Sequence, residues 1–228
     1  MKRRINRLVI DKIVRTKRRT LAIEVSRDAK LIVRAPQRMP QETIDRFVAQ
    51  KSGWIEKKKR EARKKRAAAA PKRFENGEKF LYLGRSYPLK IVENGKMPLS
   101  FDNGFALSQN RRIDARSLFV EWYKIRAKEA IKERLLYYSG LSDIEFTLFR
   151  ITSAQKRWGS CNSKGNLHFA WRLVMAPLPV VDYVVVHELV HIVEKNHSTR
   201  FWCRVERILP DYSKRRAWLR NNGSLMVL

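Results

Sequence analysis

Histidine is concentrated in one short segment of this chain. Only four histidines occur in 228 residues, and three of them, His187, His191 and His197, fall within eleven residues. The first two enclose the sequence His-Glu-Leu-Val-His, an H-E-x-x-H motif in which Glu188 follows the first histidine directly. Imidazoles bind transition metals, and a carboxylate next to such a ligand can take a proton from water. The motif therefore predicts a metal-dependent hydrolytic site with Glu188 as its general base.

The residues around the motif predict the element that must hold these side chains. Val180 to Val186 are mostly apolar, and the prolines at 177 and 179 suit the start of a helix. On a helix, His187 and His191 lie one turn apart on the same side, so both imidazoles can reach one ion. We expect this helix to end near Lys195.

The third histidine completes a ligand set. His197 follows His187 by ten residues, so the chain must turn after the helix to bring its ring back. Asn196, which tolerates left-handed geometry, is our candidate for that turn, and Ser198 or Thr199 can cap the next helix. Three protein ligands leave a fourth position for water, which is typical of catalytic zinc. Iron, cobalt or manganese would also accept these ligands.

The substrate is open between a peptide and a nucleotide. For a peptide, the alternating segment 165–173 is a candidate edge strand that an extended substrate could join. For a nucleotide, Arg157 and Arg172 could bind phosphate, and Asn166 could add a contact. No Walker A or Rossmann glycine pattern occurs. The fourth histidine, His168, lies outside ligand spacing and is expected to have a surface or core role.

The rest of the chain predicts an α+β protein in two parts. Residues 1–110 are β-rich, with a strand hairpin within residues 20–36 whose turn includes residues 27–30, and a long basic helix over 40–70. Residues 111–228 form a compact catalytic domain that begins with a helix near 112–138 and contains the histidine segment.

The charge is the second unusual feature. Fifty Lys and Arg against 22 Asp and Glu give a formal net charge of +28. Eleven of the cations fall within residues 51–73, so nucleic acid is a candidate partner for the basic helix. Two cysteines cannot form a disulfide framework, and the sequence lacks a secretory signal or a membrane-spanning run. We therefore expect a cytoplasmic protein without a membrane partner.

A series of motifs in the last third of the chain resembles a known family. They are Arg-Trp-Gly-Ser-Cys at 157–161, Trp-Arg-Leu-Val-Met-Ala-Pro at 171–177, the helix segment 182–191, Asn-His-Ser-Thr-Arg-Phe-Trp at 196–202, and the segment 210–219. In this order they resemble the YgjP-like metal-dependent hydrolases, the WLM or SprT-related group of zincins.

The resemblance implies a zincin-like domain with zinc as the cofactor. It carries over His187, His191 and His197 as ligands and Glu188 as the catalytic carboxylate. Members of the group are commonly classed as metallopeptidases, and a nucleoside-triphosphate pyrophosphatase activity on UTP has also been assigned within it. Our first hypothesis is therefore a zinc-dependent metallopeptidase, and the second is a UTP pyrophosphatase that uses the same metal site. The third is a nucleic-acid-associated protease of the SprT type.

Overall fold

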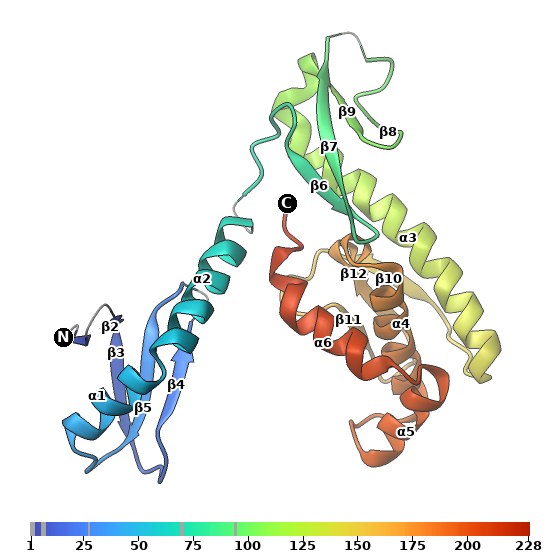
Figure 1. Ribbon diagram of the computed structural model, residues 1–228. Coiled ribbons are helices and arrows are strands. Elements are labelled where there is room, and N and C mark those ends of the chain that lie inside the picture. Colours follow the sequence, from blue (N-terminus) through green and yellow to red (C-terminus); the bar gives the residue numbers. More distant parts are fainter. Residues whose placement is uncertain (1–2, 6–7, 27, 69–70, 94) are drawn as a thin grey trace. The chain divides into compact units, whose positions relative to one another are not determined.

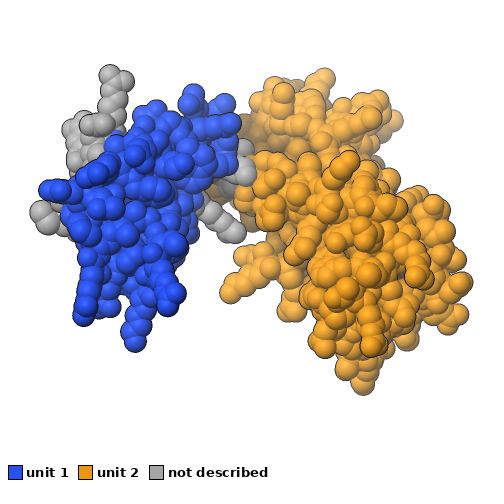
Figure 2. Space-filling view, turned by 60° about the horizontal axis from the view of Figure 1, so that its bottom comes forward, with its two compact units in different colours: residues 1–70 blue, residues 71–228 orange. Residues whose placement is uncertain are grey.

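The chain folds into two compact units, residues 1–70 and 71–228 (Figures 1 and 2). The computed structural model describes residues 3–5, 8–26, 28–68, 71–93 and 95–228. The division lies at residue 70, well before the boundary at 110 that the sequence suggests. Aromatic packing is the reason, because Phe80 and Phe105 of the intervening strands contact Phe119 of the following helix, with ring centroids 4.2 and 4.8 Å away.

The first unit is built on small sheets. Its strands are β1 (Arg3–Ile5), β2 (Leu8–Ile10), β3 (Lys12–Thr16), β4 (Ala22–Val25) and β5 (Leu31–Pro36). β1 and β2 form an antiparallel pair, and the other three form a sheet in the order β3-β5-β4. The predicted hairpin is confirmed, since β4 and β5 pair antiparallel. Arg27, in the predicted turn, lies outside the described residues.

Two helices cover this unit where the sequence predicts one over 40–70. They are α1 (Gln41–Gln50) and α2 (Ser52–Ala68), and residues 69 and 70 lie outside the described part. The helical conformation is interrupted at Lys51, just before Ser52 and Gly53, which are weaker helix formers than alanine or leucine. The break lets Ile44 of α1 and Ile55 of α2 enter the same core, where both are fully buried.

The second unit begins with a four-stranded sheet and a long helix. The strands are β6 (Lys79–Tyr82), β7 (Arg85–Val92), β8 (Leu99–Phe101) and β9 (Phe105–Ser108), in the order β6-β7-β9-β8. After a 3-10 turn, η1 (Gln109–Asp114), comes α3 (Ala115–Ser142). One side of α3 is buried at every third or fourth residue, so this helix forms the spine of the unit.

A second small sheet differs from the prediction for residues 165–173. Its strands are β10 (Phe149–Thr152), β11 (Gly159–Cys161) and β12 (Leu167–Ala170), in the order β10-β12-β11. β12 is therefore the central strand, with both edges paired, and cannot accept an extended substrate. Residues 171–175 form a 3-10 turn, η2 (Trp171–Met175), so Arg172 lies outside the strand. Strand order depends on long-range pairing, which alternation of residues along one strand does not specify.

The histidine segment lies on the most buried helix of the protein's described part. The last helices are α4 (Leu178–Val193), α5 (Thr199–Ile208) and α6 (Tyr212–Asn222), followed by η3 (Gly223–Leu225). Ten residues of α4 are buried, among them the run Val184–Val186. Valine is a mediocre helix former in isolation, but a helix that is apolar on most sides is stabilised by burial.

Two features fix the position of α4. Asp182, buried in this apolar helix, accepts hydrogen bonds from Arg134 of α3 at 2.6 Å and from Arg215 of α6 at 3.5 Å. At the start of the helix, Gly84 has a positive φ of 78° and lies so close to Pro177 that a Cβ there would be 2.7 Å from the proline ring. The β6–β7 turn and two ion pairs therefore hold the helix in place.

No helix in the described ranges is both long and apolar enough to cross a membrane.

Candidate metal centre

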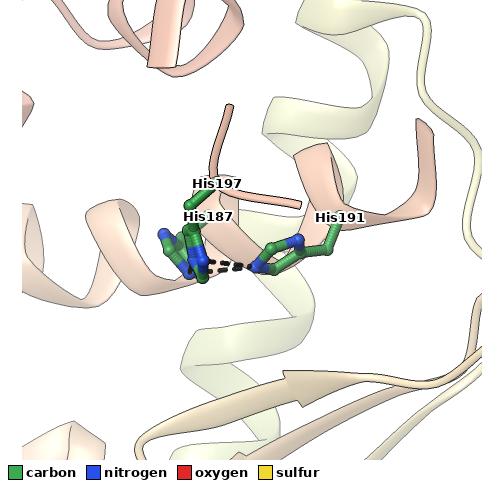
Figure 3. A group of neighbouring side chains, drawn as sticks. All are labelled: His187, His191 and His197. Atoms are coloured by element: carbon green, nitrogen blue, oxygen red, sulfur yellow. Dashed lines mark hydrogen bonds between the residues drawn. The ribbon is translucent and has the colours of Figure 1, made fainter. Parts of the chain in front are cut away.

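The three histidines of the motif segment converge on one point. His187 and His191 extend from the same side of α4, and His197 returns to them from the segment before α5 (Figure 3). Their Nε2 atoms lie 3.2 Å apart for the 187–191 and 191–197 pairs and 3.0 Å apart for the 197–187 pair. Three imidazole nitrogens directed at one another form a set of donors for a single cation.

The chain leaves α4 in a way that orients one of these rings. The helix ends at Val193, and Glu194 adopts an extended conformation with φ −121° and ψ 97°. The Glu194 carbonyl thereby accepts a hydrogen bond from Nδ1 of His191 at 3.0 Å. That bond places the ring proton on Nδ1 and leaves the Nε2 lone pair free for a metal.

The turn differs in detail from the prediction. The helix ends before Lys195, and Asn196 does not have a positive φ. A left-handed residue is unnecessary because Glu194 changes direction in the extended region, which any residue can adopt. The predicted cap is confirmed, since the Ser198 side chain accepts a hydrogen bond from the amide of Phe201 at 3.4 Å.

An aromatic layer from α5 and α6 supports the three rings. Phe201 is fully buried, and its ring centroid lies 4.5 to 4.9 Å from those of all three histidines. Trp202 stacks on His197 at 5.6 Å, and the Arg216 guanidinium lies over the indole at 4.6 Å. Stacking therefore holds the exposed imidazole of His197 in place. Among the described residues, none makes a hydrogen bond to Nδ1 of this ring.

Burial keeps the central histidine neutral. Burial, together with the positive forms of His191 and His197, lowers the pKa of His187 to about 3. A neutral imidazole at physiological pH is the form that binds a metal. The Nδ1 atom of His187 is buried and has no hydrogen-bond partner among the described residues.

Glu188 lies under β11 and is almost entirely buried, at 5% exposure. Gly159 makes room for it, since a Cβ at that glycine would lie 2.5 Å from Oε1 and 2.6 Å from Cγ of the glutamate. Burial raises the pKa of Glu188 to about 8, and the positive charge of Arg157 opposes that rise. A carboxylate with a pKa raised in this way is suited to accept a proton and to return it near neutral pH.

The three tentative substrate contacts have different environments. Arg157 is exposed and lines a pocket of about 400 Å³ together with Trp158 and His168. Asn166 closes the turn between β11 and β12, where its amide donates to the Asn162 side chain. Nη2 of Arg172 donates to the carbonyl of Ala154 at 2.6 Å, which gives that side chain a structural contact.

Sequence reasoning missed the residues that support the site. Gly159 and Phe201 lie within the recognised motifs, but nothing in the spacing indicates that one makes room for Glu188 and the other underlies the histidines. Arg216 lies in a basic stretch without a distinguishing pattern. Asp182 did carry a signal, because a carboxylate within an apolar helix needs a buried partner.

Comparisons with known proteins show the family of the chain. Residues 19–222 match the family model for the YgjP-like metallopeptidase domain. No curated protein matches the chain. Among solved structures, the metallopeptidase zymogen abylysin of Pyrococcus abyssi is similar at 19% identity and a TM-score of 0.36, over 40% of this chain and 93% of that one. Because the family model spans most of the sequence and includes the whole histidine site, the chain belongs to the YgjP-like family of metallopeptidase domains.

Proposed function

We propose that this protein is a zinc-dependent peptidase in which His187, His191 and His197 bind the metal and Glu188 is the general base. The convergence of the three Nε2 atoms carries the proposal. Zinc–nitrogen bonds of about 2.0–2.1 Å at tetrahedral angles place ligand nitrogens about 3.3 Å apart. The observed separations of 3.0 to 3.2 Å are close to that value, so a small outward movement of the rings would accommodate the ion.

The protein's own groups supply the proton chemistry. A bound zinc ion would lower the pKa of a coordinated water to about 7 and polarise the attacked carbonyl. A dication nearby would also lower the pKa of Glu188 below its metal-free value of about 8, which favours the ionised carboxylate as a base. Glu188 would take the proton from the attacking water at a carboxylate oxygen and deliver it to the leaving amine.

A peptide substrate is supported by the free edge of β11. Trp158 and Asn162, at the two ends of this strand, make backbone hydrogen bonds toward β12 of 2.8 and 3.0 Å. Hydrogen-bonded and non-hydrogen-bonded positions alternate in an antiparallel pair, so the N–H and C=O groups of Gly159 and Cys161 point away from β12. An extended peptide could pair with those groups beside Glu188. β11 thus takes the role that we expected for residues 165–173.

A nucleotide substrate is the second candidate, and it rests on charge. Arg157 acts electrostatically on Glu188, and Arg216 acts on His187. Both arginines are exposed, so both guanidinium groups are available to a phosphate. The same metal and the same carboxylate would serve a phosphohydrolase such as a UTP pyrophosphatase.

One experiment tests the proposal and separates the two substrates. The purified protein is loaded with zinc and offered casein, a peptide library and UTP. We expect peptide hydrolysis that Glu188→Gln abolishes while one equivalent of metal remains bound. His168→Ala, which removes the histidine outside the cluster, is the control for metal binding and should retain one equivalent of metal. Activity that survives Glu188→Gln, or hydrolysis of UTP alone, would refute the peptidase assignment.

A further inference from the structure

The first unit carries more than half of the net positive charge, and the proposed peptidase chemistry does not use it. Residues 1–70 contain 23 Lys and Arg against 7 Asp and Glu, a net charge of +16 out of the +28 of the whole chain. The three histidines, Glu188 and the β11 edge all belong to the second unit. A smaller unit with more than half of the net charge therefore needs its own explanation.

A groove in this unit gathers part of that charge. It has a volume of about 880 Å³ and lies between α2 on one side and β2 with the turn at Asp28–Lys30 on the other. The α2 wall presents Arg60, Arg63 and Lys64, and Lys30 lines the opposite wall. Lys59 lines the groove too, as do three acidic residues, so its lining holds five cations and three carboxylates and is positive by two charges: Asp11, Asp28 and Glu56 are the carboxylates. Cations on both walls raise the positive potential in a groove more than the same charges on a flat surface.

The α2 cations are available to a ligand. Arg60, Arg63 and Lys64 are exposed, and none of them makes an ion pair or hydrogen bond with another described residue. Their spacings of three and four residues place them on one side of the helix. Lys59 differs from them, because its Nζ donates to the Val9 carbonyl at 3.2 Å and lies 3.7 Å from Asp11. Lys59 therefore joins α2 to β2, while the side chains of Arg60, Arg63 and Lys64 are exposed to solvent.

The chemistry favours a phosphodiester chain over a membrane surface. A helix that binds a membrane inserts an apolar face among the lipids. Of the two large apolar residues of α2, Ile55 is fully buried in the core of the unit and Trp54 is 45% exposed. The helix therefore presents one apolar side chain and no continuous apolar face, and its groove side is charged. A groove of this size fits a few nucleotides of a single strand better than a duplex. Proteins that bind single strands without sequence preference combine a basic groove that follows the backbone with aromatic side chains that stack on bases. The described lining of this groove supplies the charge and contains no aromatic residue, so the contacts that we expect are with phosphates.

We propose that residues 1–70 form a binding module for single-stranded nucleic acid, with the backbone lying in the groove between α2 and β2. Arg60, Arg63 and Lys64 contact phosphates from one wall, and Lys30 contacts them from the other. The module would bring the peptidase unit to proteins on nucleic acid, but its binding does not depend on the proposed hydrolysis.

The test measures binding of the full-length chain by fluorescence anisotropy. The probes are a labelled 20-nucleotide oligo-dT, a duplex of the same length, and vesicles of phosphatidylcholine and phosphatidylserine, at several salt concentrations. We expect the oligo-dT to bind most tightly, with an affinity that falls steeply as salt rises. The triple variant Arg60→Gln/Arg63→Gln/Lys64→Gln should reduce the slope of log K against log salt by about 2, because each lost contact with a single strand contributes about 0.7.

The matched control removes the same charge outside the groove. Lys17, Arg38 and Arg46 are exposed residues of the same unit, and none of them lines the groove. Their triple replacement by glutamine should leave the slope close to that of the wild type. Equal losses in the two triple variants would overturn the proposal, as would equal binding of the duplex or preferential binding of the vesicles. Glu188→Gln should bind oligo-dT like the wild type, so a failure here is distinguishable from a failure of the peptidase assignment.

Discussion

Replacing Gly159 with alanine should disable the proposed active site without removing the three candidate metal ligands. The new Cβ would lie 2.5 Å from Oε1, 2.6 Å from Cγ and 2.8 Å from Cδ of Glu188. Carbon atoms in favourable contact are about 3.5–4.0 Å apart, so one of the two groups must move by about 1 Å. The strand is the less mobile partner, because Gly159 pairs with Phe169, which is fully buried. We therefore expect the carboxyl group to move.

The size of the effect follows from this displacement. A misplacement of about 1 Å at a catalytic group can cost about 100-fold in rate, equivalent to about 2.7 kcal/mol of transition-state stabilisation. The three atoms nearest to the added methyl group all belong to Glu188, and none belongs to a histidine. The variant should thus lose turnover and keep its metal.

The assay combines metal stoichiometry, from inductively coupled plasma mass spectrometry, with the rate of hydrolysis of the substrate that the wild type cleaves. Gly140→Ala is the matched control, because a Cβ at that helical glycine meets no atom within 4 Å. The double variant Gly159→Ala/Glu188→Gln should be no slower than Glu188→Gln alone, because both changes act on one carboxyl group. Wild-type activity in Gly159→Ala, or loss of its bound metal, would refute the reasoning.

Three other predictions concern the metal, the buried carboxyl group and the support of α4. His197→Ala should lose the bound metal that His168→Ala retains, as measured by equilibrium dialysis with zinc, and stoichiometric binding by His197→Ala would contradict the ligand assignment. In the metal-free protein, Glu188 has a pKa of about 8, against about 4.5 in the unfolded chain. Between these two pH values the folded state binds more protons than the unfolded state. The contribution of Glu188 to the free energy of unfolding therefore falls as the pH rises. Glu188→Gln should therefore gain stability relative to the wild type between pH 5 and pH 9 in urea unfolding, and a constant difference would disprove the burial effect. Asp182→Ala leaves Arg134 and Arg215 without their buried partner and should lower the free energy of unfolding by about 3–5 kcal/mol, whereas Glu133→Ala, which removes an exposed carboxylate near Arg134, should change it by less than about 1 kcal/mol.

The sequence by itself determined the local features of the site. The i, i+4 spacing of His187 and His191 is a property of any α-helix, so their common direction could be read without a structure. The Ser198 cap is equally local, because its side chain bonds an amide three residues later. The order of motifs was enough to indicate the family, because ligands and their neighbours occur at fixed distances along the chain.

Only the tertiary structure decided how distant segments meet. The central position of β12 and the free edge of β11 depend on which strands pair, and strand pairing is set by contacts between residues far apart in sequence. The space that Gly159 leaves for Glu188, and the support that Phe201 gives to all three imidazoles, arise from packing between elements that no local pattern encodes. The sequence therefore determined which groups are candidates for the proposed chemistry, and the packing of strand against helix decided how these groups lie relative to one another, because close packing is a property of the whole core.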